Sequence, residues 1–190
     1  MTDVDEVEVQ RLVAAAKQGD AEAFGQVFDV YHGPVYRYIV ARIHNPADAE
    51  DLTQVAFLKA LEALPRYEAR GIPFGGWLFR LARNTVIDHV RTRREHTDLD
   101  AIVERPGNEP EPVASVVARE EFEAVGQALA GLTDEQREAI ALRFFAGLSA
   151  REAAEAMGKR EGTVRGLQFR AIAALRRELG LEEDRKTNER

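Results

Sequence analysis

Residues 149–170 read SAREAAEAMGKREGTVRGLQFR, a pattern typical of a helix-turn-helix. Ser149 is a preferred N-cap, and Glu152 three residues later completes a capping box. Gly158 suits the left-handed residue that ends a helix, and Thr163 is expected to cap the helix that follows. The segment therefore predicts two short helices joined by a tight turn.

The second of these predicted helices has two different faces. At about 100° per residue, one side carries mostly apolar side chains, namely Val164, Leu167, Gln168, Ala171 and Leu175. The opposite side carries Arg165, Phe169, Arg176 and Arg177. An aromatic ring among arginines suits a phosphate-rich DNA groove. Most short helical pairs bind no nucleic acid, however, and Phe169 could instead cover a neighbouring helix.

Charge is distributed unevenly along the chain, which has a net charge of −7. Residues 159–177 contain six positive residues and one negative residue, whereas residues 98–123 contain eight negative and two positive residues. The acidic balance disfavours nonspecific DNA binding by the free chain. Tight DNA binding would therefore need a second surface or a larger partner.

Length and composition limit the class of protein. A chain of 190 residues can form one medium domain or two small ones. The absence of cysteine excludes disulfides and thiolate zinc sites and fits a reducing compartment. No apolar run approaches the ~20 residues of a membrane span, and the N-terminus lacks the pattern of a signal peptide. We expect a cytoplasmic protein without a membrane span.

Helical periodicity predicts an all-α fold of two small helical domains joined by an acidic, proline-containing linker. The first helical block runs from about Val9 to Arg94, with helix starts after Asp20 and at Asn45-Pro46. Helices resume at Ser115, and Thr133 with Gln136 forms a second capping box. The expected divisions are residues 1–97, a linker at 98–117, a domain with the helix-turn-helix at 118–182 and a frayed tail at 183–190.

A second functional pattern lies in residues 74–94, FGGWLFRLARNTVIDHVRTRR. One helical face carries polar and aromatic residues, namely Trp77, Arg80, Asn84, Asp88 and Arg91. The broad opposite face is apolar, with Leu78, Phe79, Ala82, Val86 and Val90. Unpaired bases stack on aromatic rings and hydrogen-bond to amides, while arginines hold the backbone. The alternative is that Trp77 anchors the core at the start of the helix.

Three motifs in this order and spacing carry a family resemblance: DAEDLTQVAF at 48–57, WLFRLARN at 77–84 and GTVR at 162–165. The chain resembles an extracytoplasmic-function (ECF) sigma factor of the sigma-70 family over residues 9–179. The resemblance implies that the first domain binds the polymerase clamp and opens the −10 element. It also implies that the linker enters the RNA-exit path and that the second domain reads the −35 element.

The resemblance further implies partners and residue roles, with no cofactor, metal or catalytic residue. The partners are core RNA polymerase (the clamp of its largest catalytic subunit and the flap of the second), promoter DNA and an anti-sigma factor. Asp48, Asp51 and Gln54 correspond to the polymerase-binding surface. The loop 66–76 followed by Asn84 corresponds to the pocket for a flipped −10 base. The remaining −10 residues are Trp77, Arg80, Arg83, Arg91 and Arg94. The −35 residues are Lys159, Arg160, Thr163, Arg165, Gly166, Phe169 and Arg170.

Three positions depart from the family pattern. Val55 stands where a glutamate commonly follows the glutamine, and Gly166 and Leu167 replace a frequent serine and arginine in the second predicted helix of the helix-turn-helix. Glycine inside a helix costs roughly 0.5 to 1 kcal/mol relative to alanine. A close approach of the helix backbone to DNA would explain the glycine at position 166.

Two other classes of function remain as alternatives. A stand-alone helix-turn-helix regulator would bind duplex DNA by itself, usually as a dimer, but this leaves the Trp77 face and the acidic linker without a role. An enzyme is the least supported class. The four histidines, His32, His44, His89 and His96, have no metal-binding spacing, and no glycine-rich phosphate loop is present.

Overall fold

The computed structural model describes residues 6–43, 45–69, 73–99 and 131–180, with the backbone alone for 94–99. Within these ranges the regular structure is helical and no β-strand occurs, which confirms the all-α prediction. Among the same residues no helix is long and apolar enough to cross a membrane. Residues 98 and 99 of the predicted linker form the end of a helix, whereas the rest of the linker, the helix start at Ser115 and the tail after Gly180 lie outside the described residues.

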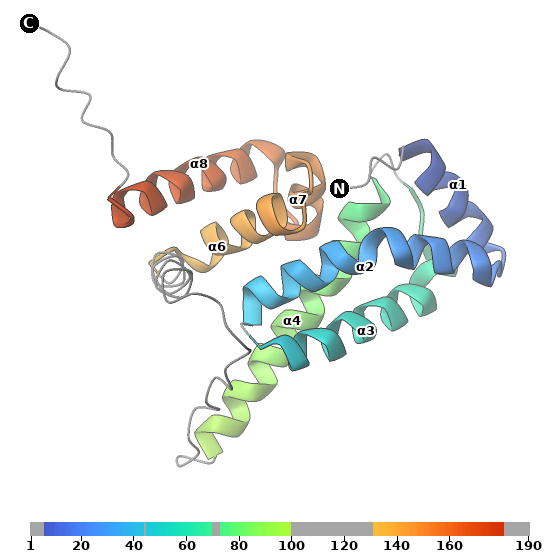
Figure 1. The fold of residues 1–190 in the computed structure, drawn as a ribbon, viewed down its shortest axis with the longest axis horizontal. Helices are drawn as coiled ribbons and strands as arrows, with labels where there is room; N and C mark the ends of the chain where they lie inside the picture. The colour runs from blue at the N-terminus through green and yellow to red at the C-terminus, as the bar shows by residue number, and fades with distance from the viewer. Residues whose placement is uncertain (1–5, 44, 70–72, 100–130, 181–190) are drawn as a thin grey trace, which may run out of the picture.

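Four helices form the first group (Figure 1), together with the short 3-10 helix η1 (Leu64–Arg66). They are α1 (Glu6–Lys17), α2 (Ala21–Ile43), α3 (Pro46–Ala63) and α4 (Phe74–Leu99). Two predicted helix starts are confirmed by their caps. Asp20 Oδ1 accepts a hydrogen bond from the Ala23 amide at 3.0 Å, and Asn45 Oδ1 accepts from the amides of Ala47 and Asp48.

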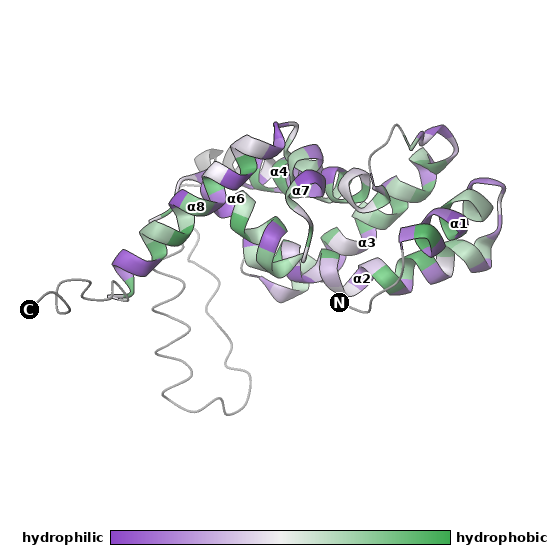
Figure 2. Cartoon of the chain, turned by 90° about the horizontal axis from the view of Figure 1, so that it is seen from above, coloured by the Kyte–Doolittle hydropathy of each residue, from purple (hydrophilic) through white to green (hydrophobic). Residues whose placement is uncertain are grey.

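The core of this group is built from the apolar sides of α1, α2, α3 and α4. The predicted apolar side of α4 is confirmed, because Leu78, Phe79, Ala82 and Val86 are buried. Tyr38 of α2 meets Phe79 edge-on, with 5.7 Å between the ring centroids. Figure 2 shows hydrophilic and hydrophobic segments along the same helices, as amphipathic packing requires.

The second group contains α6 (Asp134–Ile140), the π-helix η2 (Ala141–Phe145), α7 (Ala150–Met157) and α8 (Glu161–Glu178). Both predicted capping boxes form, at Thr133 with Gln136 and at Ser149 with Glu152. Gly158 takes the left-handed conformation, with φ of 63°, and ends α7 as expected.

The predicted cap at Thr163 is wrong, because the N-cap of α8 lies three residues earlier. Arg160 is the N-cap residue and makes no side-chain capping bond. The amides of Thr163 and Val164 both donate to the Arg160 carbonyl, so Thr163 is already inside the helix. Glu161 in the first turn has a charge that favours the helix N-terminus.

The two groups of helices pack directly against each other. Among the described elements, α4 and α7 form the most extensive contact between two helices, and η2 packs on α2. One buried cluster runs through both groups, including Phe79 of α4 and Ala153 of α7. Helix α8 packs on α6 and α7, at the end of the molecule away from α1 (Figure 1).

Candidate nucleic-acid interface

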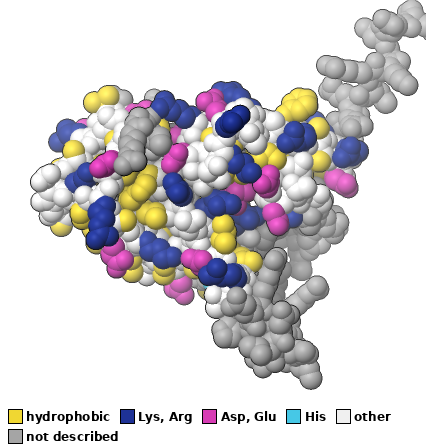
Figure 3. Space-filling model, turned by 180° about the vertical axis from the view of Figure 1, so that it is seen from behind, with side chains coloured by type: hydrophobic (Ala, Val, Ile, Leu, Met, Phe, Trp, Pro, Cys, Tyr) yellow, Lys and Arg dark blue, Asp and Glu magenta, His cyan; other side chains and the backbone are white. Residues whose placement is uncertain are grey.

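The outer face of α8 is the first candidate surface. Arg165, Phe169 and Arg170 are exposed, and Phe169 is 76% exposed. Val164, Leu167 and Ala171 are buried on the opposite side and fix the helix on α6 and α7, as the sequence predicts. Figure 3 shows basic and acidic side chains interspersed on one face of the molecule.

Arg165 is held by its own helix. Its Nη2 and Nε lie 2.6 Å and 3.0 Å from Glu161 Oε1, one turn earlier. Because both side chains are well exposed, this pair contributes little to stability. It extends the guanidinium along the exposed face toward the start of α8.

The other predicted −35 residues surround this face. Arg160 and Thr163 are exposed, whereas Lys159 is half-buried and pairs with Glu135 of α6 at 2.6 Å. At Gly166 an added Cβ would make only an ordinary contact, 3.6 Å from Arg170 Nη1. Packing within the described protein therefore does not require glycine at this position.

The polar face of α4 is the second candidate surface. Arg80, Asn84 and Arg91 are exposed on it, as predicted, while the Arg94 side chain lies outside the described residues. Trp77 is half-buried, and its ring lies 4.8 Å from Tyr67 and 5.3 Å from Phe74, centroid to centroid. Trp77 thus serves partly as the packing anchor that the alternative reading proposed.

The predicted loop 66–76 ends earlier than expected, because α4 begins at Phe74. Gly75 and Gly76 are buried in its first turn beneath α7. An added Cβ would lie 2.8 Å from Glu152 Oε1 at Gly75 and 3.2 Å from Glu155 Cβ at Gly76. The glycine pair resembles a loop in sequence but permits a close approach of two helices.

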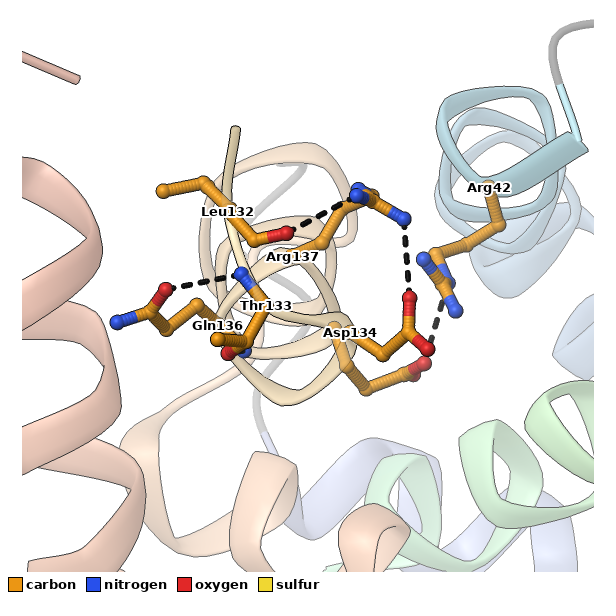
Figure 4. Close-up of polar contacts among 7 residues, drawn as sticks. Arg42, Leu132, Thr133, Asp134, Gln136 and Arg137 are labelled. Atoms are coloured by element: carbon orange, nitrogen blue, oxygen red, sulfur yellow. Dashed lines mark hydrogen bonds and ion pairs between the residues drawn. The ribbon is translucent and has the colours of Figure 1, made fainter. Parts of the chain in front are cut away.

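A buried carboxylate that no sequence pattern indicates lies beside this surface. Glu138 of α6 is 4% exposed and accepts a hydrogen bond from the Tyr38 hydroxyl at 2.6 Å. Its carboxylate also pairs with Arg42 Nε at 3.1 Å and Arg83 Nε at 3.8 Å. Figure 4 shows Arg42 reaching from α2 toward α6. Burial, and then the negative charge of Glu138, raise the pKa of Tyr38 well above its usual value.

The exposed face of α3 is the third candidate surface. Asp51 and Gln54 are exposed as predicted. Two apolar residues that were not predicted continue this face, Leu58 at 59% and Leu61 at 47% exposure. Leu58 follows Gln54 by four residues and Leu61 follows Leu58 by three, and this helical spacing was the available signal. Asp48 instead is half-buried and pairs with Arg93 Nη1 at 3.1 Å and His89 Nε2 at 3.8 Å.

Family models and relatives match this arrangement along the chain. The family described as Sigma-70 region 2 matches residues 27–96, and Sigma-70 region 4 matches residues 128–177. ECF RNA polymerase sigma factor BldN of Streptomyces coelicolor is 40% identical over 177 residues, which cover 92% of this chain and 67% of BldN. ECF RNA polymerase sigma factor ShbA of Streptomyces griseus is 33% identical over 186 residues, which cover 93% of this chain and 97% of ShbA.

This chain belongs to the ECF sigma factors of the sigma-70 family. It is an RNA polymerase sigma factor for promoter-specific transcription initiation, which confirms the resemblance in its sequence motifs. The family consists of transcription proteins that in general are not enzymes.

Solved structures of sigma factors have a similar fold. CnrH, solved in complex with the cytosolic domain of CnrY, has a TM-score of 0.71 and 27% identity, covering 92% of this sigma factor and 99% of that chain. RpoE of Bartonella quintana, solved with the anti-sigma factor NepR, has a TM-score of 0.68 and 27% identity. The match covers 85% of this sigma factor and 99% of the RpoE chain. The arrangement of this sigma factor is thus one that related proteins adopt.

Proposed function

We propose that three separate helices divide the work of this sigma factor. The exposed face of α3, with Asp51 and Gln54, docks on the clamp of core polymerase. The polar face of α4, with Arg80 and Asn84 at its centre, captures the melted −10 strand. The exposed face of α8 reads the −35 element, and the second group of helices meets the polymerase flap.

The observation that carries this proposal is the exposed face of α8. Arg165, Phe169 and Arg170 stand on a helix whose other side is fixed by buried residues. A guanidinium near the start of a recognition helix can donate two hydrogen bonds to a guanine edge, worth about 1–3 kcal/mol of discrimination. Phe169 supplies apolar contact, and Arg170 a phosphate contact.

A stand-alone regulator is the competing function. It would bind duplex DNA specifically without polymerase and would leave the exposed leucines of α3 without a partner. The mixed surface charge and the net charge of −7 favour weak binding by the free sigma factor. Nanomolar, sequence-specific binding by the free chain at physiological salt would contradict the proposal.

The deciding experiment is transcription with core polymerase on promoters that contain or lack a −35 element. The Arg165→Ala variant should reduce −35-dependent transcription by the equivalent of about 1–3 kcal/mol without lowering the melting temperature. Arg11→Ala is a matched control, because Arg11 is 69% exposed against 68% for Arg165, and each arginine pairs with a glutamate on its own helix. Equal transcription by both variants would show that Arg165 does not contact the −35 element.

The assignment of α4 has its own test. Asn84→Ala should weaken capture of a flipped −10 base by about 1–3 kcal/mol while core binding is retained. Permanganate footprinting of the open promoter measures this effect, with the exposed Gln26→Ala variant on α2 as the amide control. Normal promoter opening by Asn84→Ala would show that the melting site does not include Asn84.

We also infer an anti-sigma partner and the domain divisions given above, at residues 1–97, 98–117, 118–182 and 183–190. The partner is supported by the similar RpoE, which was solved with an anti-sigma factor. The divisions are supported by the two family regions, which fall on either side of the linker segment. Repeated co-purification of polymerase subunits alone, from stressed and unstressed cells, would count against the partner.

A further inference from the structure

Helix α1 lies outside the stretch of the chain that the family models match. It spans Glu6–Lys17, whereas the match to Sigma-70 region 2 begins at residue 27. The apolar side of α1 is buried, and the helix packs on α2. It also contacts η1 and α4, which flank the chain that leads into the proposed −10 surface. The structure therefore gives α1 neighbours beyond the helix that anchors it.

Lys17, the last residue of α1, makes two contacts with Tyr67. Its Nζ donates a hydrogen bond to the Tyr67 carbonyl oxygen and lies 6.0 Å from the centroid of the Tyr67 ring. The lysine is half-buried, where a charge-assisted hydrogen bond and an aromatic face both stabilise an ammonium. Tyr67 is the residue at which η1 gives way to extended backbone. Lys17 thus fixes the chain where it leaves η1.

Tyr67 in turn packs against the residue that begins the polar face of α4. Its ring lies 4.8 Å from that of Trp77 and 5.4 Å from that of Phe74, centroid to centroid. Tyr67 and Phe74 are buried, while Trp77 is half-buried. In a close-packed cluster one ring cannot shift without moving its neighbours. The position of Trp77 at the end of the proposed −10 surface therefore depends on Tyr67.

We propose that Lys17 is a positioning residue for −10 recognition. By holding Tyr67, it fixes the Trp77 ring at the place where the melted strand enters the face of α4. Lys17 itself is assigned no contact with DNA. The proposal rests on the proposed role of α4 in −10 binding, and it gives α1 a part in the selection of promoters.

The alternative is a structural role for Lys17 within α1. A cation in the last turn of a helix favours its macrodipole. In that case loss of the charge would lower stability without a specific effect on base capture. The two roles therefore differ in whether the effect of a Lys17 variant depends on the captured base.

The experiment compares an intact single-stranded −10 oligonucleotide with abasic versions of it, bound to the sigma factor assembled with core polymerase. The abasic position that most weakens binding by the unmodified protein identifies the captured base. Lys17→Met keeps the apolar stem without the donor or the charge, and Lys17→Arg keeps both. Arg11→Met is the control, because it removes a positive charge from the same helix at an exposed residue paired with Glu8.

The Lys17→Met complex should bind the intact oligonucleotide about fivefold or more weakly than the unmodified complex, a loss on the scale of one stacked base. It should bind the oligonucleotide that lacks the captured base as the unmodified complex does. Lys17→Arg should restore intact binding, and Arg11→Met should leave it unchanged. Unchanged binding by Lys17→Met, or an equal loss for both oligonucleotides, would overturn the positioning role alone. Equal binding of all oligonucleotides by the unmodified complex would contradict base capture by α4, and the positioning role with it.

A second measurement needs no polymerase, because Trp77 is the single tryptophan of the chain. In the free full-length Lys17→Met variant, acrylamide should quench its fluorescence about twofold more strongly, since a displaced Tyr67 ring no longer packs on the indole. Lys17→Arg should behave as the unmodified chain, with equal helicity by circular dichroism. Lys17→Gln replaces Lys17→Met in both measurements if the methionine variant does not fold. Quenching that is unchanged in the variant without the ammonium would overturn the proposal.

Discussion

Glycine has opposite roles at two positions of this sigma factor. At Gly76 the absence of a side chain lets α4 and α7 approach, because a Cβ would meet backbone atoms of Glu152 at 3.3 Å. At Gly166 the protein leaves ordinary space for a methyl group. Only the first glycine is explained by packing within the chain, so the second points to something outside it.

The first prediction concerns Gly166. Gly166→Ala should raise the free energy of unfolding by roughly 0.5–1 kcal/mol, because glycine is a poor residue for a helix interior. It should also lower −35-dependent transcription, because the added methyl would hold the backbone away from DNA. Gly25→Ala, at an exposed site on α2 with open space around it, should give a comparable gain in stability with unchanged transcription. Full activity of Gly166→Ala would show that this backbone does not approach DNA closely.

The second prediction uses the buried hydroxyl of Tyr38. Its pKa is raised by burial in the folded chain, whereas the unfolded chain ionises near the usual value of 10.0. The resulting stability is present below pH 10 and decreases as pH rises above it, by up to about 1.4 kcal/mol per pH unit. Urea unfolding between pH 9 and 11 should show a steeper loss for the unmodified chain than for Tyr38→Phe. Parallel losses would mean that Tyr38 ionises equally in both states.

At the scale of elements, the capping boxes determine where the helices of the second group begin. Ser149→Ala should lower the free energy of unfolding by about 1 kcal/mol, because an amide in the first turn of α7 loses its acceptor. Ser149→Asp retains an acceptor and should have little effect. Urea unfolding of the three proteins measures the difference, and an equal loss in both variants would assign it to packing instead of capping.

Local chemistry predicts most element boundaries in this chain. Asp20, Asn45, Thr133 and Ser149 accept hydrogen bonds from nearby amides, so neighbouring residues determine those helix starts. The start of α4 depends instead on α7, which packs onto the glycine pair, and no sequence neighbour of Gly75 indicates this. Glu138 is also hard to predict, because its partners lie on α2 and α4. The candidate DNA faces could be predicted from helical periodicity, but the packing of α7 on the start of α4 could not.

At the scale of the whole molecule, the separation of charge leads to a prediction about salt. Binding of the free chain to a −35 duplex should weaken as salt increases, because phosphate contacts displace counterions. Arg170→Ala should reduce the slope of log affinity against log salt by about 0.9 if Arg170 contacts one phosphate. Arg11→Ala, far along the chain on α1, should leave the slope unchanged. An unaltered slope in Arg170→Ala would place that residue outside the phosphate contacts.

The order of the helices along the chain gives the contact between α4 and α7 a consequence during synthesis. Translation proceeds at about 5–20 residues per second, and domains fold from the N-terminal end as they emerge. Helix α4 ends at Leu99, and α7 does not begin until Ala150. For a few seconds on the ribosome, the nascent first group of helices has its own core but not yet the helix that covers it. Each newly made molecule thus passes through an uncovered form before its own C-terminal helices close it.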